Sequence, residues 1–230
     1  MAATYAPAEA FTYAKSYVKN MPLEAVGPPL LDEVSKIIWM HAPWRWTLGA
    51  LPATTLTSST QDYTIVAPSD FLFLFDGWIS DGANVFRKLI TTAALPTDVK
   101  VVGNPSLIAH VTANTFRVYP KTGTLPASPA QQMILRYKKA APIITNQTQN
   151  TAGFLAMDDE WFWVFQAGVL WKAYIWGDDS RAGSVAMSDK GFQYSGQMGV
   201  FYDGIRQMSE KEKLPVLDPY TLANPKDAQT

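Results

Sequence analysis

The chain has 230 residues, with 19 basic and 20 acidic side chains and a formal net charge of -1. This balance makes a dedicated nucleic-acid-binding protein a poor candidate, and the lack of cysteine excludes disulfides, cysteine-ligated zinc and a thiol nucleophile. Only 17% of the residues are charged while 13% are aromatic, so we expect apolar surface that is buried against other chains.

Two helices are expected before residue 43. A first helix is predicted over 8–19, where apolar residues recur at helical spacing. The stretch 21–29 then interrupts the pattern. A second helix is predicted from Leu30 to His41, with Pro29 in its first turn, and Pro43 ends it.

The sequence HAPWRW follows this helix and is the most unusual local feature of the chain. Two tryptophans one residue apart point to opposite sides of an extended chain. We therefore predict that Pro43, Trp44 and Trp46 form a hinge between two subdomains, with one ring on each. A site for stacking a ligand on these rings is the alternative.

Short strands separated by turn residues are expected over 44–141. Their spacing of roughly 8–12 residues predicts a small antiparallel sandwich or barrel. A tight hairpin is expected over 112–115, with Asn114 in the left-handed conformation. The predicted strands are Tyr63 to Val66, Phe71 to Ile79, Val85 to Ile90, Val99 to Val102, Leu107 to Val111, Phe116 to Tyr119 and Met133 to Tyr137.

Helices return after a polar linker. One helix is predicted to run to Trp176, capped by Asp158 or Asp159, and it is apolar on every side, so it should be buried on every side. Another is predicted from Ser188 to Lys213, where several glycines indicate that another backbone packs closely. The proline-containing end of the chain is expected to be extended.

The predicted fold class is therefore α+β. A helical bundle of about four helices (1–43 and 154–214) would carry an inserted β module (44–141). A linker (142–153) and an extended C-terminal arm (215–230) complete the predicted organisation.

Residues that carry chemistry are few. Gly177-Asp178-Asp179 is better explained as a loop that ends a helix than as a metal site, and His41 and His110 each lack a second histidine nearby in the sequence. Neither a nucleophile elbow nor a P-loop is present. We expect no enzymatic activity, no cofactor and no metal.

Basic residues do not form a groove for DNA. Arg136 and Lys138 alternate with Tyr137, which predicts that both cations lie on one solvated strand face. The start of the chain lacks the pattern of a signal peptide, and 161–176 is too short to cross a membrane. We expect a soluble chain with no membrane partner.

The order of these segments resembles that of a known family. LLDEVSKIIWMHAPWRWT, QDYTIVAPSDFLFL, ILRYKKAAP and DDEWFWVFQAGVLWKAYIWGDDSRAGSV, followed by a long final helix, are similar to the head-to-tail connector, or adaptor, proteins of tailed bacteriophages. The arrangement is similar to that of adaptors related to tail tubular protein A. The resemblance spans about 30–213.

The resemblance implies a structural virion protein of the neck, assembled in the host cytoplasm. Its partners would be further copies of itself in a ring of twelve, the portal protein above, and a tail, stopper or nozzle protein below. Genomic DNA would pass through the ring without sequence-specific binding. The helices would form the ring wall, and the β module would face tail proteins or the outside.

The resemblance also implies two sets of contact residues. The arm that reaches the portal would comprise Pro215, Val216, Leu217, Tyr220 and Leu222. Packing between subunits would involve Trp161, Phe165, Trp171, Phe192, Gly199 and Tyr202.

Two other functions compete with the adaptor. A carbohydrate- or receptor-binding β module of a phage tail predicts exposed aromatic residues such as Trp78 or Phe86. A small hydrolase requires that acidic side chains gather in one pocket, for example Asp158, Asp159, Asp178 and Asp179.

Overall fold

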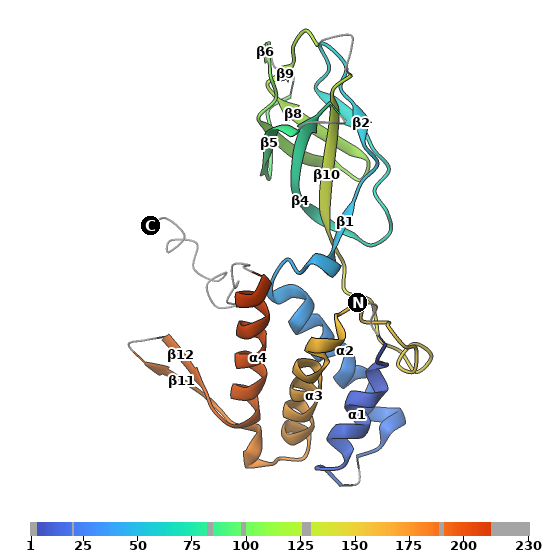
Figure 1. The fold of residues 1–230 in the computed structure, drawn as a ribbon, viewed down its shortest axis with the longest axis vertical. Helices are drawn as coiled ribbons and strands as arrows, with labels where there is room; N and C mark the ends of the chain where they lie inside the picture. Colours follow the sequence, from blue (N-terminus) through green and yellow to red (C-terminus); the bar gives the residue numbers. More distant parts are fainter. Residues whose placement is uncertain are drawn as a thin grey trace. The chain divides into compact units, whose positions relative to one another are not determined.

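A computed structural model of the chain describes residues 4–19, 21–81, 85–97, 100–125, 130–188 and 191–212. These residues form the predicted mixed α+β fold (Figure 1). The chain divides into two compact units, a helical unit of Met1–Trp46 with Ala141–Thr230 and a β unit of Thr47–Ala140. The predicted portal arm at 215–222 lies outside the described residues.

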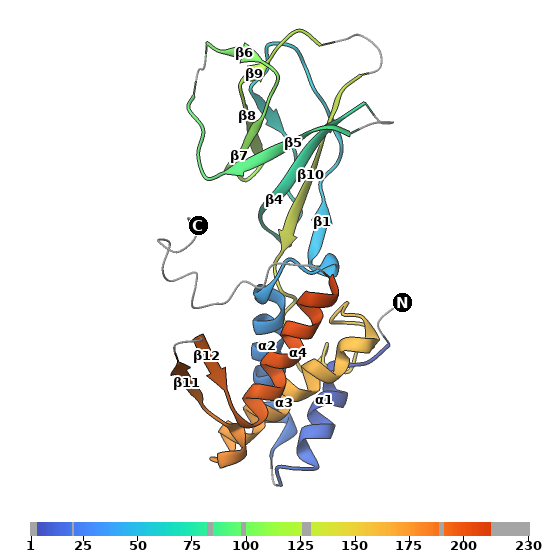
Figure 2. The same ribbon diagram turned by 60° about the vertical axis from the view of Figure 1, so that its left-hand side comes forward.

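Four α-helices make up most of the described helical unit. α3 lies among the other three helices (Figure 2) and packs against each of them. Their apolar side chains form one core. The largest fully buried side chains of this core include Phe11, Leu31, Phe165, Phe201 and Ile205. The helices are α1 (Pro7–Lys15), α2 (Leu23–His41), α3 (Phe162–Trp176) and α4 (Gly196–Glu212).

The second helix begins seven residues earlier than the sequence predicted. α2 starts at Leu23 and runs through Pro28 and Pro29, so the expectation that Pro29 lies in the first turn is wrong. The first of the added turns is stabilised by Val26, whose N–H donates to the Pro22 carbonyl at 3.0 Å and whose side chain packs against the core. Burial of apolar side chains thus offsets the two helical hydrogen bonds that the prolines cannot donate.

The start of the third helix also differs from prediction. A 3₁₀ turn, Asp159–Trp161, precedes α3, and neither acidic side chain caps it. The Asp159 carboxylate instead accepts hydrogen bonds from the Thr4 N–H at 2.7 Å and the Thr4 hydroxyl at 2.6 Å. These bonds stabilise the carboxylate and lower the pKa of Asp159. α3 itself is buried around most of its circumference, as expected.

The last predicted helix is wrong over its first eight residues. A hairpin occupies this region, with β11 (Val185–Ser188) paired to β12 (Gly191–Tyr194), and α4 begins only at Gly196. Gly191 has a φ of 99° and Gly196 a φ of 57°, in the left-handed region that glycine tolerates. These glycines therefore shape turns instead of weakening a helix.

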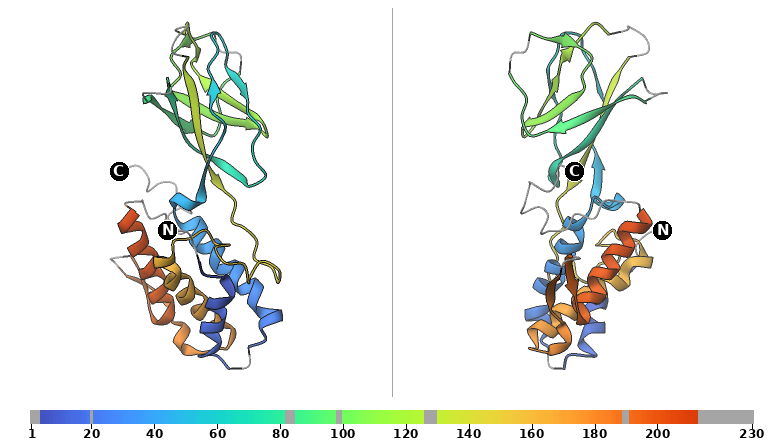
Figure 3. Two further views of the ribbon diagram at one scale, coloured as in Figure 1. Left: turned by 45° about the vertical axis from the view of Figure 1, so that its right-hand side comes forward. Right: turned by 90° about the vertical axis from the view of Figure 1, so that its left-hand side faces the viewer.

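A curled, mostly antiparallel sheet forms the β unit (Figure 3). Its strand order is β1-β10-β4-β5-β7-β8-β3, β2 also pairs with β10, and only the β5–β7 pair in this sheet is parallel. A separate parallel pair joins β6 to β9. The strands are β1 (Leu48–Ala50), β2 (Thr54–Thr55), β3 (Asp62–Thr64), β4 (Phe71–Ser80), β5 (Val85–Thr92), β6 (Val102–Gly103), β7 (Leu107–Thr112), β8 (Thr115–Tyr119), β9 (Lys121–Thr122) and β10 (Gln132–Lys139).

The predicted hairpin between β7 and β8 is present, since Thr112 pairs with Thr115. Asn114 does not have a positive φ, so the left-handed conformation expected there is wrong. The pairing of β7 with β8 shifts register between His110 and Thr112, which adjusts the ladder to the turn. The Asn114 side chain instead accepts a hydrogen bond from the Ala67 N–H at 3.2 Å.

Candidate interaction surfaces

The aromatic residues expected between subunits lie mainly inside the helical unit. Trp161, Phe165 and Trp171 are buried in its core. Gly199 and Tyr202 are half-buried on α4. The α3 residues pack against the chain's own core, so they leave little surface for a neighbour.

Exposed apolar side chains of the helical unit lie elsewhere. The sixth predicted contact, Phe192, is on the β11–β12 hairpin and is 38% exposed. Met187, opposite it in the ladder, is 83% exposed. Tyr13 on α1 and Tyr17 in the turn after it are 40% and 46% exposed, with ring centroids 5.2 Å apart.

Met187, Tyr13 and Tyr17 were not among the contact residues predicted from the sequence. A signal for the hairpin was present, because apolar residues alternate on both sides of Asp189-Lys190-Gly191. The four-residue strands were too short to stand out beside the long helical pattern that follows them.

The predicted hinge residues all belong to the helical unit. Pro43 and Trp44 are buried, and the Trp44 indole N–H donates to the Ile38 carbonyl at 2.6 Å. Trp44 and Trp46 stack with ring centroids 5.4 Å apart and planes 5° apart. The expectation of rings on opposite sides is wrong because the chain turns into a 3₁₀ helix, Arg45–Thr47, instead of remaining extended. A hinge at this position stays a prediction.

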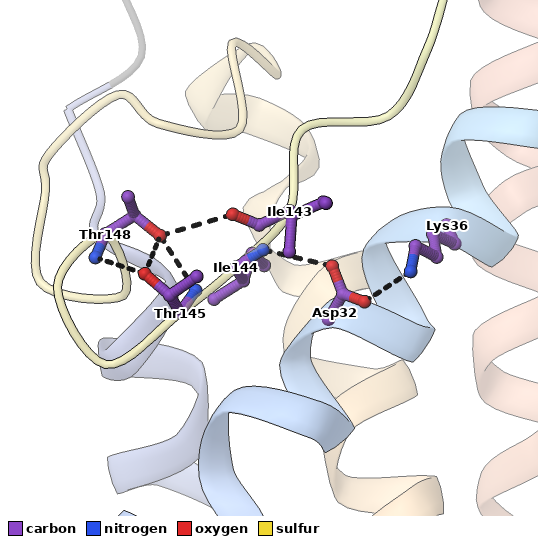
Figure 4. A network of polar contacts seen from close by, with 6 residues as sticks. All are labelled: Asp32, Lys36, Ile143, Ile144, Thr145 and Thr148. Carbon is purple, nitrogen blue, oxygen red and sulfur yellow. Dashed lines mark hydrogen bonds and ion pairs between the residues drawn. The ribbon is translucent and has the colours of Figure 1, made fainter.

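The polar segment 142–153 is fastened to the helical unit. The Ile144 N–H donates to Asp32 of α2 at 3.0 Å, and the same carboxylate pairs with Lys36 at 2.6 Å (Figure 4). Thr145 and Thr148 close the following turn with hydroxyl and backbone hydrogen bonds. The return of the chain to the helices is therefore fixed by specific contacts.

In the β unit, the expectation that two cations share a solvated strand face is wrong. Arg136 makes a bidentate ion pair with Asp76, at 2.9 and 2.5 Å, and its guanidinium lies 4.6 Å from the centre of the Trp78 ring. The Asp76 carboxylate raises the pKa of Arg136. This arrangement covers part of Trp78, which weakens its candidacy as a platform for sugars. The side chain of Phe86 lies outside the described residues.

Lys138 is buried instead of solvated. Its side chain donates to the Thr47 hydroxyl at 2.5 Å, and only 3% of the residue is exposed. Burial disfavours the charged amine and lowers its pKa to about 7. A register shift between Lys138 and Lys139 interrupts the simple alternation that the sequence suggested.

The acidic residues proposed for a hydrolase do not converge. Asp158 precedes the 3₁₀ turn before α3 and Asp178 follows its last residue, so about 20 Å of helix separates them. Asp179 pairs with Arg181 at 2.6 Å, in the loop that ends α3, as predicted for this sequence. No group of three potential metal ligands gathers within the described part of the chain.

The surroundings of the two histidines do not indicate a metal site or a hydrolase site either. His110 lies between Phe71 and Phe116, with ring centroids 4.7 and 4.9 Å away, and its Nε2 is buried without a hydrogen-bond partner. It lines a cavity of about 360 Å³ together with Phe73, Leu74 and residues 91–93. His41 lies against Tyr202 in the helical unit.

Comparison with known proteins agrees with an assembly role. The family model described as SU10 adaptor protein matches residues 39–212, a region that includes the whole β unit as well as α3 and α4. A search of curated proteins finds no match. Among the described helices, none is long and apolar enough to cross a bilayer. The expectation of a phage adaptor is confirmed at the level of the family, and the chain belongs to the SU10 adaptor protein family of bacteriophage structural proteins.

Proposed function

We propose that the protein is a head-to-tail adaptor of the same general kind as tail tubular protein A. Twelve copies would form a ring beneath the portal, extend the DNA channel and provide the platform to which the tail attaches. The observation that carries this proposal is the family match, which spans 174 consecutive residues from 39 to 212 and both structural units.

The exposed apolar surfaces support an assembly protein. An adaptor must contact neighbouring copies as well as proteins above and below it, so it needs apolar surface beyond its core. Large apolar side chains are exposed on the β11–β12 hairpin, on α1 and in the turn after α1. In the proposed ring, the helical unit forms the wall and the β unit meets tail components.

A structural, non-enzymatic role is part of the proposal. The separation of Asp158 from Asp178 supports it, as does the engagement of Asp159 by Thr4 and of Asp179 by Arg181. The near-zero net charge and the pairing of Arg136 with Asp76 favour a conduit that lets DNA pass without holding it.

The portal contact is assigned to the C-terminal arm. Val216, Leu217, Tyr220 and Leu222 are unusually apolar for a solvated terminus. A segment that becomes ordered on contact binds weakly by itself, but twelve arms on one ring would act together.

This assignment is tested with phage heads that carry a portal but lack the adaptor. Wild-type protein should co-sediment with these heads, and deletion of 215–230 should abolish co-sedimentation while the helical circular dichroism remains. A matched control replaces the same stretch by a glycine–serine sequence of equal length. Undiminished binding of the deletion variant would exclude the arm, and no binding of the wild-type protein would exclude the adaptor.

A further inference from the structure

Strand β4 has an open edge within the sheet of the β unit. Its pairing with β5 covers residues 77–80 only, although β4 begins at Phe71 and β5 continues to Thr92. β10 pairs with the other edge of β4, and the end of β5 pairs with β7. β4 and β5 therefore separate in a V (Figure 2), and residues 71–76 have a described strand on one edge only.

The residues of this open edge are strongly apolar. Residues 71–75 read FLFLF, and Leu72 and Phe73 are 43% and 46% exposed. Folded proteins usually protect an open edge with lysine or proline, because unpaired N–H and C=O groups on a strand attract further strands. None of these five residues is charged or a proline. The sequence therefore leaves the edge suited to pairing with another strand.

A cavity lies beside the open edge. It has a volume of about 360 Å³ and is lined by Phe73 and Leu74 of β4, residues 91–93, and His110 of β7. Where the two strands separate, the Thr91 hydroxyl donates to the Phe75 carbonyl at 3.5 Å, which is a long hydrogen bond. Beyond this bond the strands diverge, so the cavity provides room for a further main chain beside Phe73 and Leu74.

The main chain of Leu74 is directed toward this space. The Leu51 N–H donates to the Leu135 carbonyl, so Leu135 and Tyr137, two residues apart on β10, direct their main-chain groups away from β4. Tyr137 lies opposite Leu74. Residues opposite each other in an antiparallel pair either bond to each other or both point away. The N–H and C=O of Leu74 therefore point to the open edge.

The main-chain groups of an open strand edge are complementary to those of another extended chain. We propose that an extended segment of a tail protein pairs with β4 along residues 71–75 and fills the cavity beside Phe73. The strands at the edges of this chain's described sheets have four residues at most, shorter than the open edge, which favours a segment of a different protein over a second copy. The inference rests on the proposed function, in which the β unit meets tail components, and names that contact.

Amide hydrogen exchange tests the pairing directly. Heads that lack the adaptor are loaded with the wild-type protein and incubated with purified tails, and exchange is followed by mass spectrometry in peptides that span 71–76. Attachment of tails should slow exchange at Leu74 by on the order of tenfold or more, because its N–H gains an acceptor. Exchange in β6, which lies outside the eight-stranded sheet, should stay the same and is the internal control.

Attached tails without slower exchange in 71–76 would overturn the strand pairing and leave the adaptor standing. Slow exchange in 71–76 on loaded heads before tails are added would mean that a second copy or the portal covers the edge, and would overturn the tail segment as its occupant. Loaded heads that capture no tails would overturn both the pairing and the proposed platform for the tail.

Two lysine variants test the edge by a second route. F73K places a charge where an added strand would bury it, at a side chain that is 46% exposed in the free chain. V102K is the matched control, because Val102 is 55% exposed on β6. F73K should reduce the attachment of tails by on the order of tenfold or more, and V102K should not. Circular dichroism and binding to heads verify that both variants are folded, and equal attachment of tails by the two would overturn the pairing.

Discussion

At the scale of single residues, the β unit contains two charged groups whose surroundings the sequence did not reveal. Lys138 and Asp76 are both almost fully buried. Alternation along β10 predicts that Arg136 and Lys138 both face solvent. The pattern of a strand does not show which residues from other strands cover these two side chains. Only the fold shows that Asp76 neutralises Arg136 and that Thr47 accepts from Lys138.

Because of Lys138, the free energy of unfolding should increase as the pH rises from about 7 toward 10.5. Its pKa is about 7 in the folded chain against 10.5 ordinarily, so between these values the unfolded chain holds a proton that the folded chain has released. The cost of burying the charge is therefore complete below pH 7 and disappears as the pH rises toward 10.5. Lys138→Met should gain stability relative to wild type at pH 6.5, and this gain should shrink by on the order of 1–2 kcal/mol at pH 9.

Urea denaturation of both proteins at the two pH values measures the difference. Lys88→Met is the matched control, since Lys88 is exposed on β5 of the same sheet. A gain for Lys138→Met that is the same at pH 6.5 and pH 9 would contradict the assignment of a neutral, buried amine.

Removing one member of the Arg136–Asp76 ion pair should destabilise the protein more than removing both members. Arg136→Leu leaves the buried Asp76 carboxylate without its bidentate partner and should cost about 3 kcal/mol. The double variant D76L/R136L removes the stranded charge and should be more stable than R136L. Chemical denaturation of the single and double variants measures the coupling, and a double variant as unstable as the sum of the singles would exclude it.

At the scale of elements, the sequence predicted the existence of the four helices and of most strands better than their ends. A long, continuous apolar run located α3, and alternation located β4 and β10. The errors arose where tertiary contacts decide local structure. Packing of Val26 carries α2 through two prolines, and the crossing at Gly183 and Ser195 converts the start of a predicted helix into a hairpin.

The close packing of α3 depends on Gly168. A Cβ at this position would lie 2.6 Å from Val34 of α2 and 2.7 Å from Phe201 of α4. Gly168→Val should therefore force the three helices apart and destabilise the helical unit by about 1–3 kcal/mol. Thermal unfolding followed by helical circular dichroism measures the loss, with Gln207→Val on the exposed side of α4 as the control. Equal melting temperatures for the two variants would refute this packing.

At the scale of the whole molecule, the candidate contacts were only partly accessible to sequence reasoning. Abundant aromatic residues indicated burial against other chains, but the composition does not say which of them the chain needs for itself. In the fold, three of the predicted contact residues, Trp161, Phe165 and Trp171, belong to the core of the helical unit. Large apolar side chains that are exposed include Phe192, Met187, Tyr13 and Tyr17. Exposed apolar side chains therefore lie on short peripheral elements such as the β11–β12 hairpin and also on α3, at Trp163, Ile175 and Trp176.

We propose that copies of this chain form the ring between portal and tail. Cryo-electron microscopy of adaptor-deficient heads incubated with the purified protein tests it most directly. A closed ring of twelve copies is expected, attached to the portal and coaxial with the DNA channel. Density for the protein elsewhere on the particle, or heads whose portal stays bare at saturating protein, would contradict it.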